Sequence, residues 1–434
     1  MGELPPLGAL SDLKVVDLTQ MLAGPFATMM LADHGAEVVK IESVEGEMSR
    51  LAQPCRPEDV EHLFPGYFVS VNRNKRSIAL NLKSEASREI VRKLVADADV
   101  VVENFRSGVM DRLGLSFDIL RADNPKLVYA SIRGFGDAAG GCSPLQDWPA
   151  FDVVAQAMGG MMGITGPDEN TPTKVGPGVG DTIPAMHCAF GILAAVHHAR
   201  NTGRGQYVDI SMLDSILAVC ERIIHQYSIQ GYVAGPEGNH HPVGTPFGLF
   251  PASDGWIAIG AHKDDFWRRL CNALDVPELA DRPGFLTTAE RGVNKRAVQQ
   301  AVSEVTKNFS KAELTRRLGA IVPYGPVLNS AEIMEHPHFR ARDMIVPIEY
   351  PGIDRPIETV GVPVKLSDTP GGIHRRAPRH GEHTAEVLRE LGMDDLTIRG
   401  LAESGAIVMP PTDWIEAAEA EKASRKALQK ETVK

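Results

Sequence analysis

The sequence predicts a doubly wound α/β domain followed by a smaller α/β domain. Apolar strand patterns alternate with helical patterns along the first third of the chain, which is typical of a parallel sheet with helices on both faces. A stretch rich in glycine and proline follows, and strand and helix patterns resume near Asp254. The 434 residues are enough for two or three domains.

The first domain begins with an apolar strand over residues 13–18 and a turn into a helix that can start at Pro25, because proline suits the first helical turn. Four more apolar runs predict strands, at 35–42, 77–82, 99–105 and 126–132. Residues 134–180 are crowded with glycine and proline around one short helical pattern at 151–158. Long connections of this kind inside a domain are usually functional.

The next elements close the first sheet. A helix is expected over residues 182–200, a strand over 207–212 and a further helix over 213–230. Strand and helix patterns over 254–318 predict the smaller domain. The chain ends in short strands, a helix over 381–392 and a charged, solvent-exposed helix over 415–430.

The composition excludes several classes of protein. The 45 basic and 56 acidic residues give a net charge of −11, so no basic surface is available for nucleic acid. The longest apolar run, 185–196, is too short to span a membrane, and the N-terminus lacks the basic region of a targeting sequence. Five cysteines without a CxxC pair indicate neither disulfides nor zinc. We expect them to be small apolar core residues in a reducing, cytoplasmic protein.

The motifs of several enzyme classes are absent. The turn after the first strand has only Gly24, and no GxGxxG occurs, although Glu42 lies where a ribose-binding acid of a Rossmann-like domain is expected. GxxxxGK and GxSxG are absent as well. The 14 histidines include no HExxH, so we expect no catalytic metal.

The strongest local pattern is GPGVGDTIPAMHCAFGILAAV, in which Gly176, Gly178 and Gly180 lead to Asp181 at the start of an apolar helix. Asp181 can cap the first turn of that helix. It can also be a nucleophile, because glycines let a bulky substrate approach and a helix N-terminus favours an ionised carboxylate. The pattern alone leaves both interpretations open.

Seven segments carry a resemblance to a known family: LKVVDLTQMLAGPFATMMLADHGAEVVKIE, VNRNKRSIALNL, ADVVVENFRSGVMDRLG, FDVVAQAMGG, GDTIPAMHCAFGILAAV, TGRGQYVDISMLD and PRHGEHTAEVLRELG. Together they resemble the class III CoA-transferases, the CaiB/BaiF family that includes formyl-CoA transferase and carnitine-CoA transferase. The segments occur in the family's order over nearly the whole chain. The sequence is thereby identified as a member of that family.

The resemblance implies an aspartyl mechanism. Asp181 matches the catalytic aspartate, which attacks the donor thioester to form a mixed anhydride and then an aspartyl-CoA thioester. An acceptor carboxylate takes the CoA through a second anhydride. Acyl-CoA is therefore a substrate, and no permanently bound cofactor is implied. The implied CoA contacts are Leu22, Ala23, Leu80, Lys83, Asn104, Phe105 and Arg112, and the implied substrate contacts are Phe151, Asp152 and Met212.

The chain departs from the family's pattern at two basic positions, where it has Ser43 and Pro149. Contacts with phosphates or carboxylates must then come from other cations, such as Arg73, Arg76 or Arg106. The glycine-rich flap of formyl-CoA transferase is not found over residues 231–256. Formate and oxalate are therefore not expected as substrates.

The segments LAGPFATM and VNRNK are similar to the branch that moves CoA among dicarboxylic acids. We therefore expect succinyl-CoA as the donor and a short dicarboxylate as the acceptor. One alternative is an α-methylacyl-CoA racemase, in which a histidine base stands where this chain has Phe151, a residue that transfers no proton. The other alternative is a CoA-binding protein without catalysis, which would have no need for Asp181.

Members of the family form homodimers of two interlocked, ring-shaped chains, so the resemblance implies linkers that cross the partner. The C-terminal segment is then expected to return to the large domain. The expected division is a large CoA-binding domain at 1–205, a linker at 206–245, a small domain at 246–320, a linker at 321–345 and the C-terminal segment at 346–434.

Overall fold

A computed structural model describes residues 8–59, 63–242, 244–350 and 355–410. The chain packs as two compact units. Unit 1 contains the described residues of 1–159, 176–220 and 337–434, and unit 2 contains those of 160–175 and 221–336. The helix predicted over 415–430 lies outside the described residues. The first seven residues, where a targeting sequence would begin, also lie outside them.

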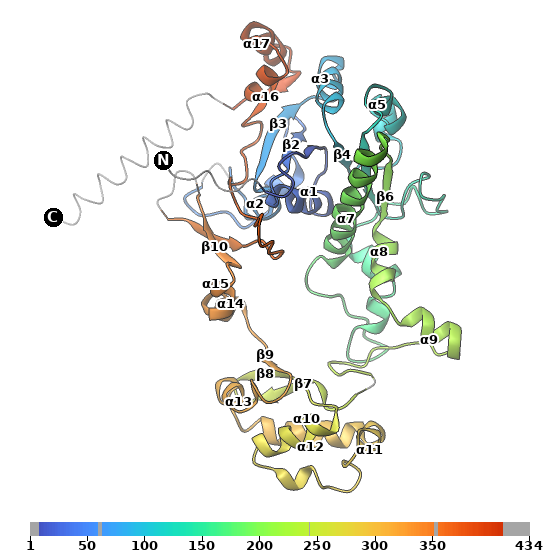
Figure 1. The fold of residues 1–434 in the computed structure, drawn as a ribbon, viewed down its shortest axis with the longest axis vertical. Coiled ribbons are helices and arrows are strands. Elements are labelled where there is room, and N and C mark those ends of the chain that lie inside the picture. Colours follow the sequence, from blue (N-terminus) through green and yellow to red (C-terminus); the bar gives the residue numbers. More distant parts are fainter. Residues whose placement is uncertain (1–7, 60–62, 243, 351–354, 411–434) are drawn as a thin grey trace, which may run out of the picture. The chain divides into compact units, whose positions relative to one another are not determined.

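Unit 1 is built on a sheet that has seven strands among the described residues, in the order β12-β3-β2-β1-β4-β5-β6 (Figure 1). The strands are β1 (Lys14–Asp17), β2 (Glu37–Glu42), β3 (Lys75–Leu80), β4 (Val100–Glu103), β5 (Val128–Arg133), β6 (Tyr207–Ser211) and β12 (Ile407–Val408). Strands β1 to β6 pair in parallel, as the sequence predicts. The edge strand β12 pairs antiparallel with β3, with Ile407 opposite Leu80.

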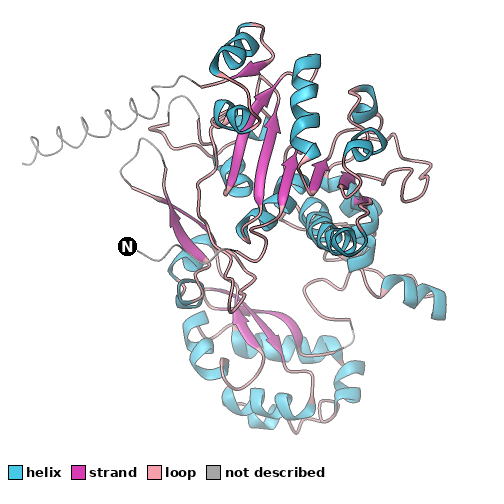
Figure 2. Cartoon of the chain, turned by 45° about the horizontal axis from the view of Figure 1, so that its top comes forward, coloured by secondary structure: helices cyan, strands magenta, loops and turns pink. Residues whose placement is uncertain are grey.

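Helices cover both faces of this sheet (Figure 2). The helices of unit 1 are α1 (Ala23–Asp33), α2 (Gly66–Asn72), α3 (Glu85–Ala96), α4 (Val109–Arg112), α5 (Phe117–Asp123), α6 (Asp152–Met158), α7 (Val179–Thr202), α8 (Met212–Val219), α15 (Pro337–Ala341), α16 (Thr384–Glu390) and α17 (Asp395–Glu403). A 3-10 turn, Met48–Leu51, and a hairpin of β10 (Ile345–Ile348) and β11 (Ile357–Val360) complete the unit.

Alternate residues of the strands enter two different cores, because side chains along a strand point to opposite faces. Val16 and Leu18 pack into one cluster with Ile90 of α3 and Leu388 of α16. Val15 is buried outside that cluster, and α1 and α7 pack against the sheet and against each other. Both faces are therefore apolar, which explains why the strands appear in the sequence as continuous apolar runs.

Helix α7 is the long apolar helix of unit 1. Its length and composition would allow it to cross a membrane. In its most apolar stretch of 18 residues, 44% is buried inside the structure. It packs against α1, α6, α8 and β5 and ends at Gly203, whose positive φ of 75° suits a glycine after a helix. Core helices of soluble proteins have the same length and composition.

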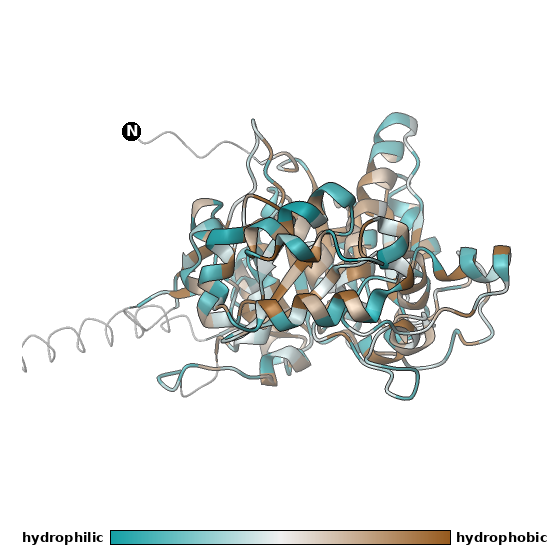
Figure 3. Ribbon diagram, turned by 90° about the horizontal axis from the view of Figure 1, so that it is seen from below, coloured by the Kyte–Doolittle hydropathy of each residue, from teal (hydrophilic) through white to brown (hydrophobic). Residues whose placement is uncertain are grey.

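Unit 2 has a three-stranded sheet of β7 (Phe247–Ala252), β8 (Gly255–Gly260) and β9 (Tyr324–Pro326). All its pairs are antiparallel, unlike the α/β arrangement predicted for this domain, because two residues join β7 to β8 and so short a connection forms a hairpin. The helices are α9 (Ile223–Gln230), α10 (Asp264–Ala273), α11 (Thr288–Val293), α12 (Lys295–Thr306), α13 (Lys311–Leu318) and α14 (Ser330–Glu335), with 3-10 turns at Met162–Ile164 and Pro277–Leu279. Among them α10, α12 and α13 bury apolar residues such as Leu270, Val298 and Leu314 and expose polar ones, as amphipathic helices do, and Figure 3 shows polar and apolar residues side by side on this face.

Two local expectations need correction. The helix predicted over 213–230 is two helices, α8 and α9, because the chain leaves helical geometry at Cys220, where ψ is 40°. The expectation that every cysteine is a core residue holds for Cys188, Cys220 and Cys271, whereas Cys142 is exposed and Cys55 is half-buried. The compact units are a division by packing, so the domain boundaries expected from the sequence stay a prediction.

Candidate functional site

A cavity of about 480 Å³ lies in unit 1 at the carboxyl ends of β1, β4 and β5. In a doubly wound sheet of order 3-2-1-4-5-6, the strand order reverses between β1 and β4, and ligands bind outside the carboxyl ends at that point. The lining residues follow these strands or face them from later loops: Gln20, Met21, Leu22, Ala23, Met48, Asn104, Phe105, Arg106, Ser107, Arg112, Ile132, Arg133, Gly134, Gln146, Asp147, Trp148, Pro149, Ala150, Phe151, Asp181 and Met212.

Asp181 lies on the cavity wall as the third residue of α7. The residue that precedes the helix is Gly178, so the interpretation of Asp181 as the cap of this helix is wrong. The Asp181 carboxylate is half-buried and makes no hydrogen bond or ion pair with the described residues. A carboxylate left without partners on a cavity wall is available to react with a ligand.

Asp152, at the start of α6, binds the first turn of α7. Its Oδ1 accepts the backbone N–H of Gly180 at 2.8 Å and the side-chain amide of Gln156 at 2.7 Å. The two helix starts approach so closely that a Cβ on Gly180 would lie 2.5 Å from the backbone oxygen of Asp152. The glycine before Asp181 is therefore required by helix packing.

Burial, and after it the negative charge of Asp152, raises the pKa of Asp181 to about 6. The sequence favoured the opposite shift, because a helix N-terminus stabilises a negative charge. Burial outweighs that effect here. Burial and the charges of Asp181, Glu47 and Asp152 also raise the pKa of Tyr67 on α2, a residue that the sequence analysis did not select.

Two predicted CoA contacts, Asn104 and Phe105, follow β4, and Asn104 holds the turn after β1. The Asn104 amide accepts the N–H of Gln20 at 2.9 Å and donates to the Gln20 carbonyl at 2.8 Å. Phe105 lines the cavity, and its backbone N–H donates to Glu103. Leu22 and Ala23, on the turn itself, line the same cavity, and Leu22 lies next to Gly178.

The structure separates the candidate cations into two groups. Arg106 and Arg112 line the cavity, and neither forms an ion pair with the described residues. Arg73 binds Asp33 bidentately, at 2.9 and 2.7 Å. Arg76 binds three glutamates, Glu37, Glu386 and Glu390. The expectation that Arg73 or Arg76 serves a ligand is therefore wrong, because acidic partners inside the fold occupy both.

Of the remaining predicted residues, some line the cavity and others do not. Phe151 is largely exposed and lines the cavity together with Met212, the buried first residue of α8. Asp152 is absent from the cavity wall and reaches the site through Gly180. Leu80 is fully buried in the core, and Lys83 is exposed beyond the end of β3. Neither Leu80 nor Lys83 lines this cavity.

Arg133 is a cavity residue that the sequence analysis missed. Its Nη2 lies 2.7 Å from Glu103 and 3.0 Å from Asp137, while its Nε and Nη1 are buried without a hydrogen-bond partner among the described residues. An arginine at the end of an apolar strand looks like a surface residue in the sequence, so no local pattern identifies it. Within the described part of the chain, no cluster of three or more histidine, cysteine or acidic residues could hold a metal ion.

The sequence model of CoA-transferase family III matches residues 10–384. The chain is 45% identical over 396 residues to the succinyl-CoA:mesaconate CoA-transferase of Haloarcula marismortui, covering 91% of this chain and 99% of the relative. It is 37% identical to the succinate–glutarate CoA-transferase of Agrobacterium fabrum, covering 89% and 96%. It is 38% identical to the formyl-CoA:oxalate CoA-transferase of Streptomyces avermitilis, covering 92% and 99%. The crystal structure of a CaiB/BaiF family protein from Brucella suis is similar with a TM-score of 0.78 and 34% identity, covering 89% and 99%.

The approach of α6 to α7 predicts that Gly180→Ala destabilises unit 1. The added Cβ meets the backbone of Asp152, which has no room to move, so we expect the Tm to fall by about 3–8 °C. Gly176→Ala is the matched control, because a Cβ at Gly176 meets nothing within 4 Å. Thermal unfolding followed by circular dichroism compares the two variants, and equal Tm values would contradict the packing argument.

Proposed function

Because the chain belongs to CoA-transferase family III, we propose that it moves coenzyme A from an acyl-CoA donor to a carboxylic acid with Asp181 as the nucleophile. One observation carries this assignment. A half-buried carboxylate without a hydrogen-bond partner among the described residues faces a cavity that also presents two unpaired arginines, Arg106 and Arg112. Such a cavity suits a ligand with phosphates and an electrophilic carbon.

The proposed reaction passes the CoA through Asp181. A carboxylate oxygen of Asp181 attacks the thioester carbon and the carbon–sulfur bond breaks. CoA leaves as a thiolate, and a mixed anhydride of Asp181 and the donor acid remains. The thiolate then attacks the Asp181 carbonyl carbon and releases the donor acid as a carboxylate, which leaves an aspartyl-CoA thioester. The acceptor carboxylate displaces the thiolate to form a second anhydride. The thiolate finally attacks the acceptor's carbonyl carbon and frees Asp181, without net proton transfer.

The geometry around Asp181 supports this role. A pKa of about 6 leaves roughly 90% of the carboxylate ionised at pH 7 and makes it more basic than an ordinary aspartate, which favours attack. The oxyanions formed on the way need hydrogen-bond donors. The N–H of Gly180 is already bonded to Asp152, whereas the N–H of Gly178 has no partner among the described residues. We infer that Gly178 supplies one such donor.

We propose that CoA lies along the cavity from Asp181 toward Arg106 and Arg112. The two guanidinium groups supply local positive charge for phosphates in a chain of net charge −11. Leu22, Ala23, Asn104 and Phe105 contact the rest of CoA from the turns after β1 and β4. Lys83 remains a candidate for a phosphate because it is exposed, whereas Leu80 is fully buried and offers no surface to CoA.

We propose succinyl-CoA as the donor and a short dicarboxylate as the acceptor. The names of relatives that act on mesaconate and glutarate with succinyl-CoA or succinate support this choice. Phe151 and Met212 offer an apolar surface near Asp181 for the carbon chain of the acid. A relative of similar identity acts on oxalate, so oxalate belongs in the test even though the sequence lacks the glycine-rich flap.

Two further proposals concern assembly and location. We propose a homodimer, supported by the exposed apolar residues Met186 and Phe190 on α7, and the mass of the protein in solution tests it. We propose a cytoplasmic location, which fractionation of cells tests.

The racemase alternative is disfavoured by Phe151, which lines the cavity where a racemase would need a proton-transferring base.

The nucleophile assignment predicts that Asp181→Ala abolishes transfer while the protein stays folded. Wild-type protein incubated with succinyl-CoA and hydroxylamine is expected to carry a hydroxamate at Asp181, because an anhydride or thioester there is attacked by the amine. Peptide mass spectrometry locates the modification. Asp147→Ala, which removes another carboxylate from the same cavity wall, is the control and retains the trap. Wild-type transfer rates in Asp181→Ala would refute the nucleophile.

The raised pKa predicts an acid limb in the pH profile of kcat/KM at about pH 6, because protonated Asp181 cannot attack. Activity is lost as the pH falls through that value. Asp152→Asn removes the like charge but keeps an oxygen for the Gly180 N–H, so the limb should move down by about 0.5–1 pH unit. Asp147→Asn should leave the limb in place. An unmoved limb in Asp152→Asn would refute the charge effect.

The substrate proposal predicts a preference for acids with a second carboxylate. With succinyl-CoA as donor, dicarboxylates of four to six carbons should exceed monocarboxylates of matched length by roughly 10- to 100-fold in kcat/KM, as one charge-assisted contact gives. The acceptors assayed are formate, oxalate, malonate, succinate, glutarate, hydroxymethylglutarate, mesaconate and carnitine, with butyrate as the matched monocarboxylate. Equal rates with butyrate and succinate would remove the dicarboxylate proposal and leave the transferase mechanism standing.

A further inference from the structure

The turn after β1 has a strained shape and forms part of the cavity wall. Gln20, Met21, Leu22 and Ala23 all line the cavity. Met21 has a φ of 64°, in the left-handed region that side chains other than glycine, asparagine and aspartate rarely adopt. A backbone held in that region needs contacts from its surroundings that define it.

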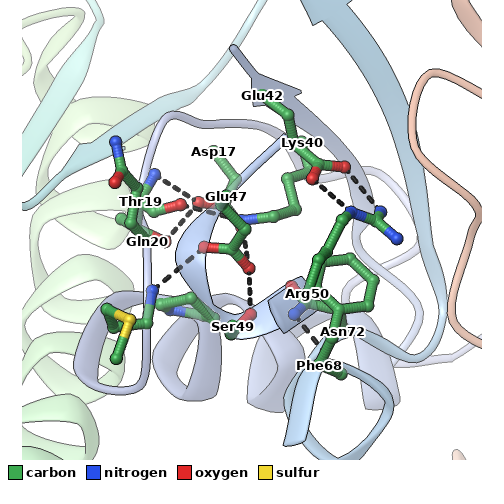
Figure 4. A network of polar contacts seen from close by, with 12 residues as sticks. Asp17, Thr19, Gln20, Lys40, Glu42, Glu47, Ser49, Arg50, Phe68 and Asn72 are labelled. Atoms are coloured by element: carbon green, nitrogen blue, oxygen red, sulfur yellow. Dashed lines mark hydrogen bonds and ion pairs between the residues drawn. The ribbon is translucent and has the colours of Figure 1, made fainter. Parts of the chain in front are cut away.

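Two buried charged residues hold the backbone of this turn (Figure 4). Lys40 of β2 donates from its Nζ to the carbonyl of Thr19 at 2.7 Å. Glu47 accepts the N–H of Met21 on Oε2 at 3.0 Å and the hydroxyl of Ser49 on Oε1 at 2.6 Å. The Lys40 Nζ lies 3.7 Å from the Glu47 Oε1, and the two side chains are 0% and 2% exposed.

Glu47 also joins two walls of the cavity. It directly precedes Met48, which lines the cavity from a different segment of the chain, and it binds Met21, 26 positions earlier. A buried ion pair seldom stabilises a fold more than apolar residues of the same size would. The pair fixes the backbone of a ligand-facing turn, which apolar residues cannot do because they accept no N–H and donate to no carbonyl.

We propose that Lys40 and Glu47 are positioning residues that hold the turn at Thr19 to Ala23 in the shape that binds CoA. This inference rests on the proposed function, because it assumes that CoA occupies the cavity. Neither side chain lines the cavity itself, so both act through the backbone of the turn. Asp181 stands on a different element, α7, so we expect the turn to affect CoA binding more than the chemical step.

The test is Glu47→Gln, which keeps the size of the side chain and removes the charge that faces Lys40. Its readouts are the Kd of CoA by calorimetry, the KM for succinyl-CoA and kcat. We expect the Kd and the KM to rise about tenfold, as the loss of a charge-assisted bond predicts, while kcat changes less than about threefold. A role confined to stability would lower the Tm and leave the Kd unchanged.

Asp33→Asn is the matched control. Asp33 also makes a buried ion pair, with Arg73, and undergoes the same change from carboxylate to amide. It holds no residue of the cavity wall, so this variant should lower the Tm without changing the Kd. Equal Kd values for wild type, Glu47→Gln and Asp33→Asn would overturn the positioning role.

A milder pair of variants covers the case in which Glu47→Gln does not fold. Ser49→Ala removes the hydroxyl that orients Glu47 and should weaken CoA binding about threefold. Ser87→Ala removes an equally buried hydroxyl, bonded to the carbonyl of Ala406, and should leave binding unchanged. An unchanged Kd in Ser49→Ala would also overturn the proposal. Wild-type protein that binds no CoA would refute the proposed function instead, so the two failures are distinguishable.

Discussion

The arrangement of unit 1 depends on the buried carboxylate of Asp17 at the end of β1. It accepts hydrogen bonds from the Thr19 N–H at 2.9 Å, the Thr28 hydroxyl at 2.7 Å and the Lys75 ammonium at 3.0 Å. These contacts tie β1 to α1 and β3 at the point where the cavity turn begins. Burial alone would raise the pKa of Asp17, but the charges of Lys75 and Lys40 hold it far below its usual range. The carboxylate therefore stays ionised and its partners stay in place.

The sequence was sufficient for the parallel sheet, because the apolar runs at β1, β4 and β5 alternate with helical patterns, as is typical of a sheet buried on both faces. It also located the nucleophile candidate, since a glycine run before an apolar helix is visible in the chain itself. The family predicted from seven segments is confirmed by the match over residues 10–384. What the sequence could not supply are contacts between distant residues, such as Asp152 with Gly180 or Glu47 with Met21. A buried glutamate and a surface glutamate look the same in a sequence.

The segment VNRNK shows that a sequence resemblance can rest on residues that lie away from the ligand cavity. Its similarity to the dicarboxylate branch was one reason to expect a dicarboxylate. In the structure Asn72 accepts from Lys75, Lys75 binds Asp17, and Arg73 and Asn74 both bind Asp33. No residue of the segment lines the cavity. The segment therefore preserves the packing of β3 against α1 and does not itself form part of the cavity wall. The residues that we propose to select that acid lie on the loops after β5 and at the starts of α6 and α8.

The fold disfavours the ionised form of Asp181, while hydrogen bonds and an ion pair hold the residues around it in place. Asp181 is half-buried, has no hydrogen-bond partner among the described residues and lies near the like charge of Asp152, and each of these features destabilises its ionised form. Hydrogen bonds to Asp181 would lower its pKa and make it a weaker nucleophile, so its isolation favours reaction. An isolated charge needs neighbours that do not move toward it. The bond from Gly180 to Asp152 fixes one side of the site, and the pair of Lys40 and Glu47 fixes the facing turn. The buried polar network thus lets the proposed nucleophile remain unpaired in an ordered cavity.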